Sequence, residues 1–179
     1  TDGTAREAEI AKEEVEGVLR EYGAEHVETA SEPEEAESLW RARKAISPAL
    51  YSYGPDKINE DIVVPRSRLP DMVERIRLLS EKTGLTMVSF GHVGDGNIHF
   101  NIMYDSRRPE HDIAARQSVD EIFEYTLELG GTISGEHGVG ISKAPYMELE
   151  ISPRALALMK RIKSAFDPAG ILNPGKMKL

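Results

Sequence analysis

The sequence of 179 residues contains no cysteine. This absence excludes a disulfide framework, a thiolate nucleophile, an iron–sulfur cluster and a cysteine-type zinc site. A metal ion must therefore be held by nitrogen and oxygen ligands. Basic residues are a minority, since 22 Lys and Arg stand against 31 Asp and Glu and give a net charge of −9. This sign disfavours a nucleic-acid partner, because most of such a surface repels phosphates.

Long hydrophobic runs are also missing. Runs such as Ile62-Val63-Val64 are far shorter than the roughly 18 to 20 residues that cross a bilayer. The first residues have neither the basic and then apolar pattern of a secretory signal nor the acid-poor composition of a transit peptide. We therefore expect a cytoplasmic location, or a peripheral one at the inner face of a membrane.

The spacing of apolar residues predicts an ordinary globular domain of helices and strands. Helices are expected over 6–22, 33–48, 67–84, 110–129 and 153–166, with Pro48 interrupting the second one. Strands are expected over 57–65, 85–90 and 98–104, and 25–30 could form another. The strands lack the continuous hydrophobic runs of a parallel sheet, so the pattern favours an α+β fold with an antiparallel sheet covered by helices.

The segment GHVGDGNIHFN, residues 91–101, contains two histidines around a glycine-rich turn. Asp95-Gly96 is typical of a two-residue type I′ hairpin loop. Such a loop would place His92 opposite His99 on one side of the hairpin, with their Cβ atoms about 4.5 to 5.5 Å apart. The pair could bind one metal ion, although a single histidine is more often a buried polar residue satisfied by its neighbours.

A second glycine-rich segment, SGEHGVG at residues 134–140, holds Glu136 next to His137. Adjacent side chains on an extended backbone point opposite ways. Either residue could therefore complete a metal site of two histidines and a carboxylate, while the other faces a substrate. The glycines alone are explained equally well by tight turns. The remaining histidines, His26 and His111, are predicted to be solvated surface residues.

Basic residues cluster in the predicted second helix at Arg41, Arg43 and Lys44. Such a cluster usually forms a charged solvent-exposed face. It could also bind a carboxylate, because a guanidinium group forms a two-pronged pair with that group. Weaker candidates of the same kind are Arg66, Arg68 and Lys143.

Five blocks of the chain, in this order, resemble the C-terminal half of FAD-linked 2-hydroxy acid oxidoreductases of the vanillyl-alcohol oxidase superfamily. The resemblance covers almost the whole chain and is closest to enzymes of the glycolate oxidase, D-lactate dehydrogenase and D-2-hydroxyglutarate dehydrogenase type. The blocks are LWRARKAISPAL, NEDIVVPRSRLPDMV, GHVGDGNIHFN, GTISGEHGVGISK and AFDPAGILNPGK.

This resemblance implies a ferredoxin-like cap domain that covers the substrate side of a flavin. Residues 1–150 would form this cap, and a C-terminal helix and tail, 151–179, would return toward an FAD-binding domain that the sequence does not contain. In the tail, Asn173 matches an asparagine that lies close to the flavin. Thr1-Asp2-Gly3 looks like the end of a truncated first strand, so an exposed sheet edge and self-association are expected.

The resemblance also implies a site chemistry. His92, His99 and Glu136 match ligands of a divalent metal, often zinc, and His137 matches the base. Arg43 matches an arginine near the substrate carboxylate. These residues suit oxidation of a small 2-hydroxy acid, in which a proton leaves the hydroxyl group as hydride passes to FAD.

The expected partners are the substrate, the chain's own FAD-binding domain or the subunits of an oxidase complex, and a second copy of the chain. Without the FAD-binding domain, the isolated chain should bind FAD poorly and turn over nothing. Two alternatives remain: a stand-alone metal- or partner-binding α+β module without redox activity, and an enzyme of the alkyl-dihydroxyacetone-phosphate synthase type, which uses flavin without net oxidation.

Overall fold

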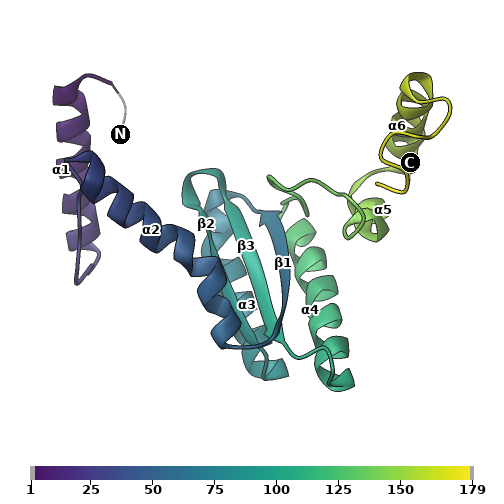
Figure 1. Ribbon diagram of the computed structural model, residues 1–179, viewed down its shortest axis with the longest axis horizontal. Helices are drawn as coiled ribbons and strands as arrows, with labels where there is room; N and C mark the ends of the chain where they lie inside the picture. Colours follow the sequence, from purple (N-terminus) through teal and green to yellow (C-terminus); the bar gives the residue numbers. More distant parts are fainter. Residues whose placement is uncertain (1–2, 178–179) are drawn as a thin grey trace. The chain divides into compact units, whose positions relative to one another are not determined.

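The computed structural model describes residues 3–177, in two compact units that meet in sequence between Ala49 and Leu50. The first unit contains α1 (Ala5–Glu21) and α2 (Pro33–Ala49) (Figure 1). Thr4 caps α1 by a capping box, in which the Glu7 carboxylate accepts the backbone N–H of Thr4 at 2.8 Å.

Two local predictions for this unit were wrong. The segment 25–30 forms no strand. Pro48 does not interrupt α2 but lies within its last turn, one residue before the helix ends. Proline has no backbone N–H, so Pro48 removes one hydrogen bond of the helix. Because the helix ends one residue later, this loss does not divide it into two parts.

The second unit contains the sheet. No helix within residues 3–177 is both long enough and apolar enough to cross a bilayer. As predicted, the third helix ends at Gly84, whose left-handed backbone (φ 71°) is the usual helix stop. The helices and strands are β1 (Asp56–Val63), α3 (Leu69–Thr83), β2 (Thr86–His92), β3 (Asn97–Tyr104), α4 (Pro109–Glu128), α5 (Met147–Glu150) and α6 (Pro153–Phe166).

The three strands form one antiparallel sheet in the order β1–β3–β2 (Figure 1). Together with α3 and α4, the chain order β1–α3–β2–β3–α4 is that of a ferredoxin-like fold up to its last strand. At the position of that strand, on the free edge of β1, there is an isolated antiparallel bridge between Val63 and Thr132. The prediction of an α+β, ferredoxin-like fold with an antiparallel sheet is therefore confirmed.

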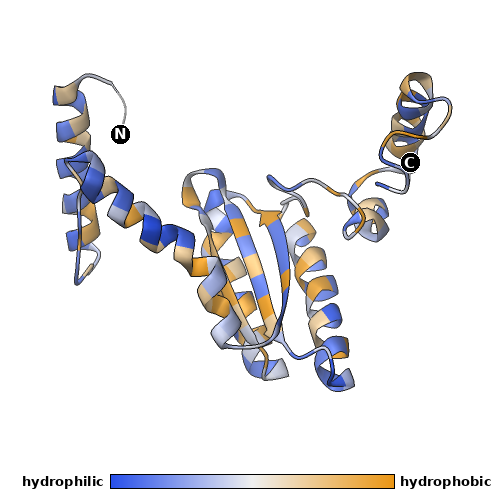
Figure 2. Cartoon of the chain, viewed as in Figure 1, coloured by the Kyte–Doolittle hydropathy of each residue, from blue (hydrophilic) through white to orange (hydrophobic). Residues whose placement is uncertain are grey.

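One face of the sheet packs against α3 and α4 and forms the core. Along β3 this face carries Ile98, Phe100 and Ile102, which alternate with polar residues, as the orange and blue bands in Figure 2 show. Burying a side chain of this size contributes about 1.5 to 3 kcal/mol. The helices supply Met72, Ile76, Leu79, Ala115, Val119, Ile122 and Phe123, and β1 supplies Ile62.

The opposite face of β3 is polar although it is buried. It carries Asn97, His99 and Asn101, each less than 10% exposed. On β1, Asp61 lies opposite His99, and its side chain has no exposed surface. Buried polar groups need hydrogen-bond partners, so this row must be held by specific contacts.

The connection between β2 and β3 differs from the predicted two-residue loop. It has four residues, a 3₁₀ turn over Val93–Asp95 and then Gly96 with φ 73°. His92 consequently lies opposite Asn97, and His99 lies opposite Phe90. Gly96 is held by Val64, the residue that follows β1: its carbonyl oxygen accepts the N–H of Val64 at 3.0 Å, and a Cβ at this position would overlap the Val64 carbonyl oxygen.

Candidate metal centre

His92, His99 and Glu136 lie together at one end of the sheet. Each offers a ligand atom, and these atoms lie within 4.8 Å of one another. The Nε2 atom of His92 is 3.6 Å from a carboxylate oxygen of Glu136, and the two imidazole rings meet edge to face at 5.4 Å between centroids. The register change moved His92 by two residues, which keeps it on the same face as His99. The predicted proximity of the two histidines therefore holds in the structure.

His137 also lies beside His99. Their rings stack with centroids 5.3 Å apart and planes inclined by 12°. Glu136 and His137 therefore both approach His99. On the extended backbone expected from the sequence, these two adjacent side chains would point in opposite directions. The reason is local, because residues 135–137 form a bend and not an extended strand. His137 is exposed, whereas His99 is buried.

Asp61 holds this bend in place, a role that the sequence motifs did not indicate. One oxygen of its carboxylate, Oδ2, accepts the backbone N–H groups of Gly135, Glu136 and His137, at 3.0, 2.6 and 2.8 Å. The other oxygen, Oδ1, accepts the side-chain amide of Asn97. Burial alone would raise the pKa of Asp61, but the bonds from His137 and Asn97 outweigh it and hold this pKa below its usual value.

The environment of His99 favours the neutral imidazole. Burial lowers the pKa of His99, and the nearby His137 and His92 act in the same direction, while the carboxylate of Asp61 opposes them. A metal ion binds imidazole in its neutral form. Two imidazoles and a carboxylate form a donor set that suits zinc and related divalent ions, so these residues fit such an ion.

Lys143 supports the centre from the core side. It is 3% exposed, and its Nζ atom donates to the backbone carbonyl of Asp61 at 2.7 Å and lies 3.6 Å from the carboxylate of Glu60. Burial lowers the pKa of Lys143 and raises that of Glu60, and each partner opposes the shift of the other. Lys143, a weaker candidate for binding a carboxylate, is thus a buried residue whose charged group contacts Glu60 and Asp61 within the chain.

The other predicted site residues lie elsewhere in the chain. Arg43 is a half-buried residue of α2 in the first unit. Asn173 lies in the tail after α6 with a positive φ of 48°. That tail is anchored by Asp167, which accepts the N–H groups of Ile171 and Leu172 at 3.0 and 2.9 Å.

The two remaining histidines differ in exposure. His26 is a surface residue, 83% exposed, as predicted. His111 is half-buried, and its Nδ1 atom is buried without a hydrogen-bond partner, so the prediction of a solvated side chain was wrong for it.

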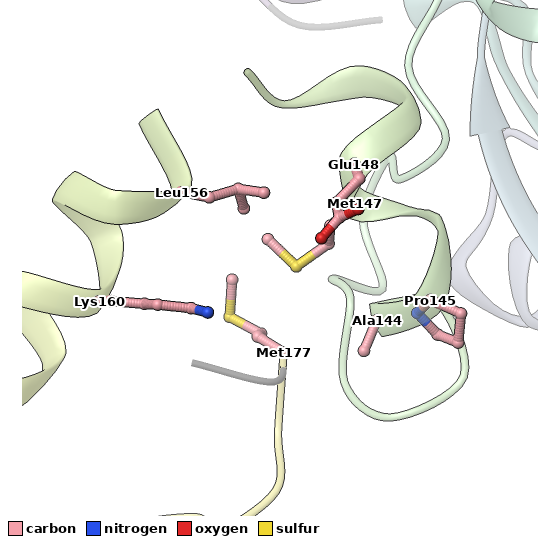
Figure 3. A pocket seen from close by; sticks show the side chains of 7 residues that line it. All are labelled: Ala144, Pro145, Met147, Glu148, Leu156, Lys160 and Met177. Atoms are coloured by element: carbon pink, nitrogen blue, oxygen red, sulfur yellow. The ribbon is translucent and has the colours of Figure 1, made fainter. Parts of the chain in front are cut away.

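A separate hollow of about 280 Å³ lies near the C-terminal tail (Figure 3). Met147 from α5 and Met177 from the tail face one another in it, and the N–H of Met177 donates to the carbonyl of Gly140 at 2.7 Å. The hollow contains no histidine, so it is distinct from the candidate metal centre. Its lining residues are Ala144, Pro145, Met147, Glu148, Leu156, Lys160 and Met177.

Comparison with known proteins agrees with the α+β fold of the chain. A solved structure of 4-ethylphenol oxidase from Gulosibacter chungangensis superposes with a TM-score of 0.53 at 20% identity, covering 83% of this chain and 31% of that one. The family model for FAD linked oxidases, C-terminal domain, matches residues 1–177. The chain belongs to this family.

Relatives by sequence include a glycolate oxidase subunit and two dehydrogenases. The chain is 43% identical over 176 residues to glycolate oxidase subunit GlcD of Bacillus subtilis, covering 98% of this chain and 37% of that protein. It is 37% identical over 150 residues to the mitochondrial D-lactate dehydrogenase [cytochrome] of Arabidopsis thaliana, covering 83% and 26%. It is 34% identical over 148 residues to D-2-hydroxyglutarate dehydrogenase of Stutzerimonas stutzeri, covering 80% and 32%. The chain thus spans about a third of the length of these relatives.

Proposed function

We propose that this chain is the substrate-binding cap half of a flavin-dependent dehydrogenase or oxidase of small 2-hydroxy acids, of the glycolate or D-lactate type. The observation that carries the proposal is the convergence of His92, His99 and Glu136 within 4.8 Å, with His137 stacked on His99. These are the four residues to which the resemblance assigns metal binding and catalysis. The names of the relatives support the substrate class.

In this proposal His92, His99 and Glu136 hold one divalent ion, with zinc as the expected metal. Three protein ligands leave positions open for the hydroxyl and carboxylate oxygens of a 2-hydroxy acid. His92 and Glu136 are partly exposed, with side chains 43% and 55% accessible, so a small substrate can reach the site from solvent.

The residues of this chain then have separate roles in the reaction. When bound, the metal lowers the pKa of the substrate hydroxyl, and FAD accepts the hydride from the carbon that bears it. His137 is exposed beside His99 and takes the hydroxyl proton on a ring nitrogen. Arg43 neutralises the substrate carboxylate by a two-pronged hydrogen bond.

The proposal extends to the architecture. Residues 1–150 form the cap, and 151–179 return toward the FAD-binding domain, where Asn173 approaches the flavin. FAD is bound mainly by that domain, so the isolated chain is inactive. The partners are this domain or the subunits of an oxidase complex, and a second copy of the chain can pair through a free sheet edge. The proposed location is the cytoplasm or the inner face of a membrane.

The substitution His137→Ala in the full-length protein, FAD-binding domain included, tests this function. Loss of the base should lower kcat with D-lactate or glycolate by about 100-fold or more, while metal content stays at the wild-type value. His26→Ala, at an exposed histidine outside the centre, is the control and should keep wild-type kcat. A normal kcat in His137→Ala would remove the assigned role of this residue.

A further inference from the structure

Asp61 contacts both segments that form the candidate metal centre, the bend at residues 135–137 and His99 in β3. It lies in β1, which pairs directly with β3 of the hairpin that carries His92 and His99, and its side chain is fully buried. Three successive backbone N–H groups, from Gly135 to His137, converge on its Oδ2 atom. A single carboxylate thus fixes the backbone of Glu136 and His137, the two functional residues of the second segment.

The other carboxylate oxygen of Asp61 faces His99. Its Oδ1 atom is 3.7 Å from the Nδ1 atom of His99, and this nitrogen is buried with no hydrogen-bond partner. A neutral imidazole carries its proton on one nitrogen only. A proton on Nδ1, beside the carboxylate, leaves the lone pair of Nε2 free for a metal ion, as in many carboxylate–histidine–metal arrangements.

Asp61 is itself held in position by hydrogen bonds to its backbone carbonyl and to its side chain. Lys143 donates to its backbone carbonyl at 2.7 Å from within the core. Asn97 donates to its Oδ1 atom, and also to the carbonyl oxygen of Ile62 at 3.3 Å. The carboxylate cannot turn without breaking these contacts, so it presents the same two oxygens to the bend and to His99.

We infer that Asp61 is the positioning residue of the metal centre: it sets the tautomer of His99 and holds the Glu136–His137 backbone so that the ligands meet. This inference deepens the proposed function and rests on it. Asp61 acts through its neighbours and not as a ligand, because its Oδ2 atom already has three donors and its Oδ1 atom accepts Asn97 and faces His99.

The test is ¹⁵N nuclear magnetic resonance on the metal-free chain, in the wild type and in Asp61→Asn. In the wild type, the His99 ring should show the proton on Nδ1, and the amide protons of residues 135–137 should resonate far downfield, as expected for bonds to a carboxylate. A wild-type His99 with its proton on Nε2 overturns the inference, and this observation needs no variant to fold.

Asp61→Asn keeps the shape of the side chain but replaces one acceptor oxygen by a donor. The groups bonded to the carboxylate all donate to it, so an amide N–H₂ in place of one oxygen breaks at least one of these bonds, and the tautomer preference and the downfield shifts should be reduced. Zinc affinity, measured by competition with a chelator, should fall about 10- to 100-fold. Asp56→Asn is the matched control in the same strand, because Asp56 lies at the far end of β1, where it accepts the N–H of Ser106, and it should change none of these readouts.

An Asp61→Asn variant with the wild-type tautomer and amide shifts would also contradict the inference. If neither protein binds zinc, the proposed metal site fails, yet the tautomer and the amide shifts still decide the positioning role of Asp61. The two failures are therefore distinguishable.

Discussion

The carboxylate of Asp61 accepts the backbone N–H of His137 at 2.8 Å across 76 positions of sequence. This bond joins the sheet to the glycine-rich bend, so the candidate metal centre can form only when both segments are in place. The stability of the sheet and the geometry of the centre are therefore coupled, and substitutions at the contact should affect both.

Gly135→Ala should damage this contact. A Cβ at this position would overlap the amide nitrogen of Asn97 and lie 2.9 Å from the Oδ1 atom of Asp61. We expect a loss of about 1 to 3 kcal/mol in unfolding free energy, measured by urea denaturation, because neither neighbour can move freely. Gly94→Ala is the control, since a Cβ there meets open space and should change stability by less than about 0.5 kcal/mol. Equal stabilities of the two variants would contradict the crowded geometry.

Phe123→Ala should be among the most damaging core substitutions. Phe123 is fully buried in α4, and its ring meets that of Tyr146 edge to face at 4.7 Å. Truncation should cost about 3 to 5 kcal/mol in urea denaturation of the isolated chain. Phe166→Ala, at a side chain 83% exposed in that chain, should cost less than about 0.5 kcal/mol. A cost below about 1 kcal/mol for Phe123→Ala would show that this core is packed differently.

Tyr146 should give the protein a stability that is lost in strong alkali. Burial and a hydrogen bond to Asp120, with Oη donating to Oδ1 at 2.6 Å, raise the pKa of Tyr146 to about 12. In the unfolded chain this pKa is about 10. The contribution is therefore complete below pH 10 and disappears as the pH rises through 12.

Absorbance of tyrosinate at 295 nm measures this directly. The wild type should show a tyrosine that titrates near pH 12 and that is missing in Tyr146→Phe, and the stability difference between the two proteins should shrink between pH 10 and 12. Loss in the variant of a tyrosine that titrates near pH 10 would contradict the hydrogen bond to Asp120 and the raised pKa of Tyr146.

Arg43→Ala in the full-length protein should weaken substrate binding. Loss of a charged hydrogen bond to the substrate carboxylate corresponds to about 10- to 100-fold in KM for a 2-hydroxy acid. Arg41→Ala, two residues earlier on the exposed surface of α2, should leave KM unchanged. Unchanged KM in both variants would remove the role that the resemblance assigns to Arg43.

Most of the fold was predictable because hydrophobic spacing is a local signal. The stripe of Met72, Ile76 and Leu79 identified α3, and Gly84 marked its end, within two residues of the observed boundaries. The hairpin register was not predictable, because the turn is fixed by a bond between Gly96 and Val64, which follows β1 and lies outside the hairpin. Asp-Gly alone favoured a shorter loop than the tertiary contact allows.

The proximity of the candidate ligands His92 and His99 was predictable from the sequence, but the contacts that hold the site in place were not. His92 and His99 stood out by their place in a glycine-rich hairpin, and the shift by two residues kept them on one face. Asp61 gave only a faint signal, a carboxylate inside a predicted strand, because its partners lie 74 to 76 positions further along the chain. Contacts of that range cannot be derived from periodicity.

The most direct test of the central claim is the metal content of the chain after removal of metal by a chelator and reconstitution with zinc, measured by plasma mass spectrometry. The wild type and the His26→Ala control should each hold about one zinc per chain, and His92→Ala combined with His99→Ala should hold none. Equal zinc content in the wild type and the double variant, or no zinc in a folded wild type, would contradict the assignment of these histidines as metal ligands.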